Sequence, residues 1–360
     1  MKALKRIVLL ALILLVGLWI FALWDLHHEE HHYVVLSAEQ QTQAAQYLIG
    51  KLSPEPTDWN WSSYTPEPGV NLRTGMVDAD NAKGTVIVVP GFTATIEMTM
   101  REIAKINAAG YRVASIEYRG QGESWRPLAN PEKGYVQSYE QLGAELAGFA
   151  KQVRLAGKPL FFYSISKGAH ITMRMATEQD LDVSAYALIV PMIKINTGSL
   201  NYEMTHIFSA LFSKLGLGAM YAPGQTNRFG NGFQLGTPIP CNANPDTAQT
   251  QDALFAQREL LRASGATMQW LYETTSSTEH LLKSENIAKI TQPVMMVTAG
   301  IDALVDTNVA QGFCSSLRQC ELTHIEQARH CITRENFDLY DGLVAQAIEH
   351  FNLHRQANKH

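Results

Sequence analysis

The chain has 360 residues, of which 46% are hydrophobic and 18% are charged, and its formal net charge is −5. This composition predicts a sizeable folded core and excludes a largely disordered protein. Lysine and arginine are scattered rather than gathered in a basic stripe, so no nucleic-acid partner is expected. A chain of this length can hold one large domain with an insertion or two smaller domains.

The N-terminus combines basic residues with a long apolar run. Three basic side chains precede an uninterrupted apolar segment, residues 7–24, which as a helix would nearly cross the hydrocarbon core of a bilayer. A cleaved signal peptide has a shorter apolar region and a small-x-small cleavage site, which is missing where this run ends at Trp24. We therefore expect an uncleaved transmembrane anchor over residues 1–25. Its N-terminus would be cytoplasmic and the remaining chain non-cytoplasmic, in the periplasm if the source is a Gram-negative bacterium.

The sequence HHEEHH, residues 27–32, directly follows the anchor. On a helix His27 would share a face with His31, and His28 with His32, which is a spacing found in metal sites. No further cluster of ligands accompanies them. We therefore expect a solvated juxtamembrane segment and no metal site.

Beyond the anchor, the chain changes character twice. Residues 26–80 predict a juxtamembrane segment, a short helix and edge strands around several prolines and tryptophans. From residue 81 onward, short apolar runs that predict buried parallel strands alternate with amphipathic segments that predict helices. The predicted strands are residues 84–91, 111–118, 158–166, 184–192, 292–300 and 320–328.

Such alternation predicts an α/β fold, with a mostly parallel sheet and helices on both of its faces. The alternation breaks over residues 194–286, which are mainly helical or irregular. We therefore expect a core in two parts, residues 81–193 and 287–360, with an inserted helical cap between them.

Polar residues follow three of the predicted strands at their carboxyl ends, which lie at one edge of an open α/β sheet. Ser166 stands between Ser164 and Gly168, and a tight nucleophile turn requires small residues at both of those positions. Asp302 and His330 follow two later strands. The order serine, aspartate, histidine is that of the α/β-hydrolase triad, in which the histidine takes the serine proton and the aspartate holds the imidazole.

The loop after the first predicted strand is where an oxyanion site belongs. There the backbone N–H groups of Phe92 and Lys167 would receive a developing negative charge. Each site residue alone has a simpler explanation, since a serine or an aspartate near a helix is often only a cap. Together they predict an α/β-hydrolase fold and a working serine site. The glycines at 120 and 122 lack the third glycine and the helix of a dinucleotide site, so no cofactor is expected.

Apolar side chains recur at helical spacing within the cap. Most such stripes pack in a core, but over the carboxyl edge of the sheet they would wall a channel for an acyl chain. Each buried CH₂ group contributes about 0.8 kcal/mol, so an amphiphilic or lipid substrate could bind there without polar contacts. The predicted substrate-binding residues are Phe208, Leu211, Phe212 and Met220.

The four cysteines include no CxxC pair, which argues against zinc and thioredoxin-like sites. A domain outside the cytoplasm can form disulfides. Cys314 and Cys320 are close enough in sequence to pair across a helix-to-strand turn. Cys241 and Cys331 would remain, but nothing in the sequence supports that pairing.

Several stretches of the sequence resemble the lysophospholipase L2 and monoacylglycerol lipase group of α/β hydrolases. The resemblance implies hydrolysis of monoacyl lipid esters and a cap that lines an acyl tunnel. It also implies Ser166 as nucleophile, Asp302 as acid and His330 as base. The stretches are VPGF, IEYRGQGESWRPLANPEKGYVQSYEQLGAEL, SISKGA, VPM, VTAGIDALVD and EQARHCITREN.

The chain departs from the family pattern around the site, but no departure removes a catalytic group. Pro90 stands where the family has a histidine, Ser164 where it has a glycine, and Cys331 where an acidic residue often follows the histidine. Lys167 replaces the usual methionine. A lysine beside the nucleophile indicates either a preference for an anionic substrate or a solvated helix start, and the second is the simpler interpretation.

The favoured function is a membrane-anchored serine hydrolase that cleaves esters of a lysophospholipid or a monoacylglycerol through an acyl-enzyme. A thioesterase, an acyltransferase or a peptidase could use the same triad. The fold alone would also suit a non-catalytic envelope protein that binds a ligand. The head group of the substrate, the oligomeric state and the role of Lys167 stay open.

Overall fold

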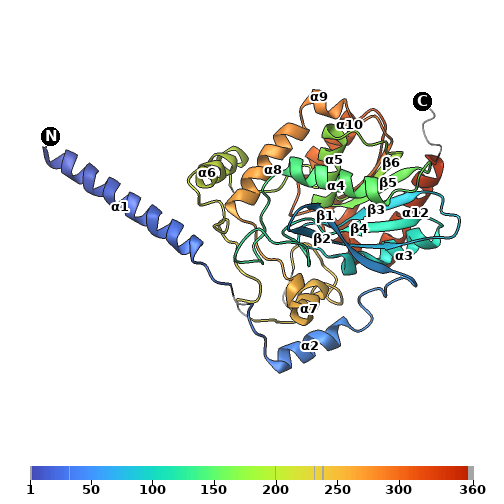
Figure 1. Ribbon diagram of the computed structural model, residues 1–360, viewed down its shortest axis with the longest axis horizontal. Coiled ribbons are helices and arrows are strands. Elements are labelled where there is room, and N and C mark those ends of the chain that lie inside the picture. The colour runs from blue at the N-terminus through green and yellow to red at the C-terminus, as the bar shows by residue number, and fades with distance from the viewer. Residues whose placement is uncertain (1, 32, 199, 231, 237–238, 356–360) are drawn as a thin grey trace.

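The computed structural model describes residues 2–31, 33–198, 200–230, 232–236 and 239–355. At its centre is an eight-stranded sheet with the strand order β1-β2-β4-β3-β5-β6-β7-β8 (Figure 1). The strands are β1 (Asn60–Glu67), β2 (Val70–Val77), β3 (Thr85–Val89), β4 (Arg112–Ile116), β5 (Leu160–Ile165), β6 (Ala185–Ile189), β7 (Val294–Ile301) and β8 (Cys320–Arg329).

The sheet is mostly parallel, which confirms the predicted fold. β1 and β2 form an antiparallel hairpin, and β2 also runs antiparallel to β4. The other six strands are parallel to one another. The central strands β3, β5 and β6 are buried along their whole length, as expected for apolar strands that are covered on both faces.

Helices cover both faces of the sheet, and each face has its own apolar cluster. In β3, Val86 and Val88 belong to one cluster and Ile87 and Val89 to the other, because successive strand residues point to opposite faces. The first cluster includes α3 (Met100–Ala108) and α12 (Phe337–Leu353). The second includes α4 (Tyr139–Val153), α5 (Lys167–Glu178) and α10 (Thr307–Ser316).

A mainly helical cap lies between β6 and β7. Within it α6 packs along α8, and α7 packs against α2, which comes from the N-terminal part of the chain. The α2–α7 contact has its own small apolar cluster, separate from the two faces of the sheet. The helices between β6 and β7 are α6 (Tyr202–Lys214), α7 (Thr250–Gln257), η2 (Glu259–Leu261), α8 (Met268–Leu281) and α9 (Ser284–Ile287), and α2 (Ala38–Leu48) precedes β1. Two short helices outside the cap are η1 (Ile96–Thr99) and α11 (Ile332–Glu335).

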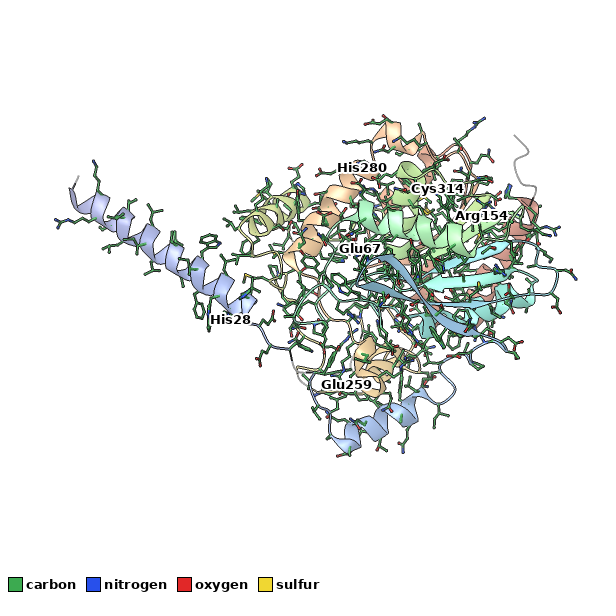
Figure 2. All side chains as sticks on the ribbon, in the orientation of Figure 1. His28, Glu67, Arg154, Glu259, His280 and Cys314 are labelled. Atoms are coloured by element: carbon green, nitrogen blue, oxygen red, sulfur yellow. A yellow bond between two sulfur atoms is a disulfide. The ribbon has the colours of Figure 1, made fainter. Side chains whose placement is uncertain are left out.

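The N-terminal helix α1 (Lys2–His27) projects away from the body, and its side chains stand free along most of its length (Figures 1 and 2). Its residues 5–27 form a 23-residue helix that is long enough to cross a membrane, and its most apolar 18-residue window has a mean hydropathy of 2.9. An N-terminal signal sequence can meet the same criteria of length and hydropathy, so these criteria alone do not distinguish it from an anchor. Trp19 connects α1 to the cap, because its Nε1 donates a hydrogen bond to the Leu215 carbonyl oxygen at 2.9 Å.

The prediction of a solvated segment after α1 is confirmed only in part, because His27, His28 and Glu30 are exposed whereas Glu29 and His31 contact the body. Lys133 Nζ lies 2.6 Å from Glu29 Oε2, and His31 Nε2 lies 3.4 Å from Glu132 Oε1. The Lys133–Glu29 ion pair and the contact between His31 and Glu132 hold the segment against the loop before α4. No cluster of three or more potential metal ligands occurs among the described residues, and His32 lies outside them.

The four cysteines form two disulfides. Cys314 in α10, labelled in Figure 2, bonds to Cys320 at the start of β8, across the helix-to-strand turn that the sequence predicted. Cys241 in the cap bonds to Cys331, 90 residues further along the chain. Only the tertiary fold brings this second pair together, which is why the sequence could not support it.

Candidate active site

A strained turn between β5 and α5 presents Ser166. Its φ of 50° and ψ of −114° are rare for a residue with a side chain, and such values gather at functional sites. Gly168 makes the turn feasible, because a Cβ there would lie 2.4 Å from the Val89 carbonyl oxygen. Ser164 is fully buried and its hydroxyl shares a 2.8 Å hydrogen bond with Thr172, so a serine fits where the family has a glycine.

The three residues predicted from the strand ends lie in hydrogen-bond contact. His330 Nε2 is 2.8 Å from Ser166 Oγ, and His330 Nδ1 is 2.6 Å from Asp302 Oδ2. The other carboxylate oxygen of Asp302 accepts the backbone N–H groups of Leu304 and Val305 at 2.8 and 3.0 Å. The Asp302 side chain is 1% exposed, so it can hold the imidazole in one orientation away from water.

Asp306, the other acidic residue after β7, has a structural role. Its carboxylate accepts the Val309 N–H at 3.1 Å and caps the N-terminus of α10. The helix cap that was the simpler explanation for Asp302 is therefore supplied by Asp306, and Asp302 is left to contact His330.

The Phe92 loop after β3 lies close to the N-terminus of α5. A Cβ on Gly91 would be only 3.3 Å from the Ser166 Cβ. Tyr118 fixes the position of this loop, because its hydroxyl lies 3.0 Å from the carbonyl oxygens of both Pro90 and Gly91. Among the described residues, no backbone acceptor takes the N–H of Phe92 or of Lys167, so both donors stay available for an oxyanion.

Lys167 is buried, so the interpretation as a solvated helix start was wrong. Its Nζ lies 4.5 Å from the ring centroid of Tyr118, 5.4 Å from that of Phe92 and 6.0 Å from that of Tyr139. No ion pair involves Lys167 among the described residues, and burial lowers its pKa to about 7. Contacts with aromatic faces offset part of the cost of burying the ammonium. The side chain packs between α5 and the Phe92 loop, which carry the two backbone donors.

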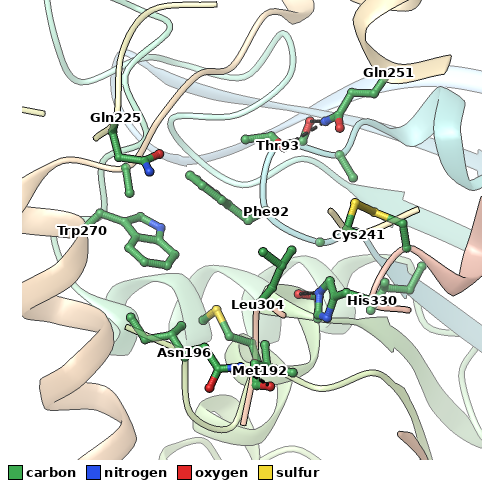
Figure 3. A pocket seen from close by; sticks show the side chains of 18 of the residues that line it. Phe92, Thr93, Met192, Asn196, Gln225, Cys241, Gln251, Trp270, Leu304 and His330 are labelled. Carbon is green, nitrogen blue, oxygen red and sulfur yellow. Dashed lines mark hydrogen bonds between the residues drawn. A yellow bond between two sulfur atoms is a disulfide. The ribbon is translucent and has the colours of Figure 1, made fainter. Parts of the chain in front are cut away.

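A cavity of about 430 Å³ opens at Ser166 and His330 (Figure 3). Much of its wall is apolar and comes from the cap and from the loops after β6 and β7. Trp270 on α8 stacks near Phe92, with ring centroids 4.9 Å apart. The apolar lining residues are Ala94, Met98, Ile165, Met192, Ile195, Leu200, Ala222, Pro223, Ala266, Leu271, Leu304 and Val305.

The structure does not bring the four predicted substrate-binding residues to this cavity. Phe208 and Leu211 on α6 are 51% and 49% exposed, and neither Phe212 nor Met220 lines the cavity. The helix α6 packs against the protein through its polar face, because its buried residues are Thr205 and Ser209. The apolar stripe of α6 therefore faces outward, and Trp270 and Leu271 of α8 form the wall instead. Nothing in the α8 sequence set these two residues apart from ordinary core positions.

The Cys241–Cys331 disulfide fastens the cap to the turn that carries His330. Cys331 directly follows His330 in the chain, and its N–H donates to the Cys241 carbonyl oxygen at 2.8 Å. Both cysteines line the cavity. The position of the imidazole is thereby tied to a cap segment 90 residues away in sequence.

Comparisons with known proteins give the family of the chain. Residues 80–336, more than half of the chain, match the family described as serine aminopeptidase, S33. The chain belongs to this family.

Individual relatives were found by sequence and by structure. The chain is 22% identical to lysophospholipase L2 of Escherichia coli strain K12 over 281 residues, which are 75% of this chain and 78% of the relative. Its fold is similar to that of monoglyceride lipase from Saccharomyces cerevisiae, with a TM-score of 0.64, 17% identity, and 84% and 100% of the two chains covered. A carboxyl esterase from Bacillus coagulans gives a TM-score of 0.63 at 15% identity, with 82% and 98% covered.

These matches confirm the predicted resemblance to the lysophospholipase and monoacylglycerol lipase group of α/β hydrolases. They also support a serine ester hydrolase as the class of enzyme.

The buried Lys167 predicts a pH-dependent stability. Because its pKa is about 7 in the folded protein and 10.5 in the reference state, the unfolded chain binds more protons between these values. The free energy of unfolding should therefore rise with pH above about 7, by at most about 1.4 kcal/mol per pH unit from this group. Lys167→Met should flatten the rise, as measured by denaturant unfolding in detergent at several pH values. An unchanged slope in the variant would refute this role of Lys167.

Because the Cys241–Cys331 disulfide fixes the turn that carries His330, we expect its loss to lower the catalytic rate. Replacing Cys241 and Cys331 by serine frees the His330 turn, and misplacing a catalytic group by about 1 Å can cost up to about a hundredfold in rate. We expect kcat for a soluble ester to fall about tenfold or more. The matched control replaces Cys314 and Cys320, which lie away from the cavity, and should keep its kcat. Equal losses in the two double variants would mean that the disulfides act only on stability.

Proposed function

We propose that the protein is a membrane-anchored serine hydrolase that cleaves the carboxylic ester of a monoacyl lipid. The observation that carries this proposal is the hydrogen-bonded chain from Ser166 through His330 to Asp302, which opens into a cavity with apolar walls. The names of the relatives point to the same class, because a lysophospholipase and a monoglyceride lipase both act on lipids with one acyl chain.

The geometry suits an acyl-enzyme mechanism. His330 Nε2 takes the Ser166 hydroxyl proton as Oγ attacks the ester carbonyl carbon, and the imidazolium that forms is stabilised by Asp302. The backbone N–H groups of Phe92 and Lys167 donate to the oxyanion of the tetrahedral intermediate. The intermediate collapses when His330 gives its proton to the leaving alcohol. A water molecule, deprotonated by His330, then attacks the acyl-enzyme and releases the fatty acid and free Ser166.

The cavity favours an acyl chain over a peptide. The wall around Trp270 and Leu271 is mostly apolar, and each CH₂ group of an acyl chain buried there contributes about 0.8 kcal/mol. Binding the amino terminus of a peptide calls for a carboxylate partner. Among the described lining residues no aspartate or glutamate occurs, so the aminopeptidase activity named for the family is the weaker candidate here.

The outer surface of the cap supports attachment to a membrane. The exposed apolar residues of α6 recur at helical spacing, and α6 ends beside the α1 helix, where Trp19 bonds to the Leu215 carbonyl oxygen. Two disulfides that use all four cysteines are typical of proteins in oxidising compartments. We therefore propose that α1 is an uncleaved anchor and that the body lies on the non-cytoplasmic side. The exposed apolar residues of α6 and its C-cap are Met204, Ile207, Phe208, Leu211 and Leu215.

The first test of the proposed chemistry is covalent labelling. A fluorophosphonate probe should label the wild-type protein at Ser166, because the probe reacts with an activated serine. Ser166→Ala should abolish labelling and ester hydrolysis, whereas Ser164→Ala, which changes the buried neighbour, should retain both. A wild-type protein that is not labelled would refute every catalytic hypothesis.

The second test concerns the substrate class. We expect kcat/KM for monoacyl esters of one head group to increase with acyl length, up to the capacity of the cavity, because each CH₂ group adds binding energy. A preference for short acyl groups across such a series would argue against a lipid substrate.

The membrane proposal predicts that deleting α1 changes where the protein is found but not how fast it hydrolyses a soluble ester. Deleting residues 2–27 should move the protein from the membrane fraction to the soluble fraction in the presence of about 1 M salt, which screens ionic attachment. Hydrolysis of a soluble short-chain ester should change less than about twofold, because α1 touches no catalytic group. If the full-length protein is instead recovered without residues 1–25, as shown by N-terminal sequencing, α1 is a signal peptide.

A further inference from the structure

The cavity has a second end, which is polar and lies beside His330. Thr93, Gln251 and the Cys241–Cys331 disulfide are on this side, away from Trp270 (Figure 3). Arg334 and Thr333 also line the cavity, on the turn that follows His330. The cavity therefore has a mostly apolar side around Trp270, where Gln225 and Asn196 also lie, and a polar side beside His330 (Figure 3).

Arg334 gives this polar end a positive charge. It is the one permanently charged side chain among the described residues that line the cavity, and no carboxylate lines it. Burial lowers the pKa of Arg334 only to about 10, so the guanidinium stays charged at neutral pH. The nearby Asp252 is already engaged, because its Oδ1 lies 3.2 Å from Arg228 Nη1. Arg334, Arg228 and Asp252 together therefore carry a net charge of +1.

The guanidinium of Arg334 is also short of hydrogen-bond acceptors. Its Nη2 contacts only the sulfur of Cys331, at 3.4 Å, which is a weak acceptor. Its Nη1 is buried and has no partner among the described residues. A buried cation without an acceptor costs free energy, and an anion that enters the cavity would offset that cost. A phosphate group matches the planar donors of arginine better than any neutral group does.

We propose that the polar end of the cavity is a subsite for the phosphodiester of a lysophospholipid head group, with Arg334 as its cationic residue. The inference rests on the proposed function and chooses between its two substrates, since a monoacylglycerol carries no anion. The acyl chain would lie along Trp270 and Leu271, with the ester carbonyl at Ser166. Arg334 lies four residues after His330, in the short helix α11, and both residues line the cavity.

The experiment compares two lipids that share one acyl chain, 1-oleoyl-lysophosphatidylcholine and 1-oleoylglycerol, in mixed detergent micelles. Arg334→Gln should lower kcat/KM for the lysophospholipid about tenfold, because a hydrogen bond to a charged group is lost. The same variant should change kcat/KM for 1-oleoylglycerol less than about twofold, which also shows that it is folded. Arg334→Lys, which keeps the charge, should recover part of the lost activity.

A matched control removes a charge from the same turn without touching the cavity. Arg329 Nη1 donates to the Pro240 carbonyl oxygen at 3.2 Å, and the side chain does not line the cavity. Arg329→Gln should therefore leave the ratio of kcat/KM values for the two lipids unchanged. Glycerophosphocholine, used as a product inhibitor, should inhibit the wild type more strongly than Arg334→Gln, whereas glycerol should not distinguish them.

The outcomes separate the two proposals. If Arg334→Gln lowers kcat/KM for both lipids equally, or for neither, the phosphodiester subsite is refuted while the lipid hydrolase stands. If the wild-type protein hydrolyses neither lipid but is labelled by a fluorophosphonate, the proposed substrate class fails and the subsite falls with it.

Discussion

The crowding of three backbone segments around Ser166 is the constraint on which the site depends. The turn after β5 must pass so close to the end of β3 that a Cβ at position 168 would lie 2.4 Å from a carbonyl oxygen. This approach forces Ser166 to a positive φ and points its hydroxyl out of the carboxyl edge of the sheet. The same approach sets the Phe92 loop opposite the N-terminus of α5. The Ser166 hydroxyl and the two backbone N–H groups of Phe92 and Lys167 therefore share one small space.

The features predicted correctly from the sequence are those that local patterns determine. Buried apolar runs fix the parallel strands, and strand ends gather at one edge of a parallel sheet, so Ser166, Asp302 and His330 could be located without any knowledge of tertiary contacts. The α6 stripe shows where this reasoning stops. Helical spacing shows that one face of α6 is apolar, but not whether protein, substrate or a bilayer covers that face. In the structure the polar face is the buried one, so the prediction of a substrate wall was wrong.

Two other features depend on contacts between distant segments, and the sequence could not reveal them. The Cys241–Cys331 disulfide joins residues 90 positions apart that meet only because the cap folds back over the His330 turn. The burial of Lys167 depends on Tyr118 and Tyr139, which come from a separate loop and from α4. The position of Lys167 at a helix start indicated solvent, because helix ends are usually exposed. Here the helix start lies under the Phe92 loop instead, and that placement follows from the close approach at Ser166.

Arg334 gives the cavity a positive charge, whereas the buried Lys167, whose pKa is lowered to about 7, carries only part of a charge at neutral pH. Neither cation forms an ion pair among the described residues, although a cation held away from water is stabilised most effectively by a carboxylate. A carboxylate in the cavity would satisfy Arg334, but under the proposed function it would also repel an anionic substrate and the proposed oxyanion at Ser166. An unpaired Arg334 would instead keep its field directed at an anionic head group. The cost of burying Arg334 would then be offset when the substrate binds, an effect on substrate affinity, whereas the barrier itself is lowered only by contacts that strengthen in the transition state.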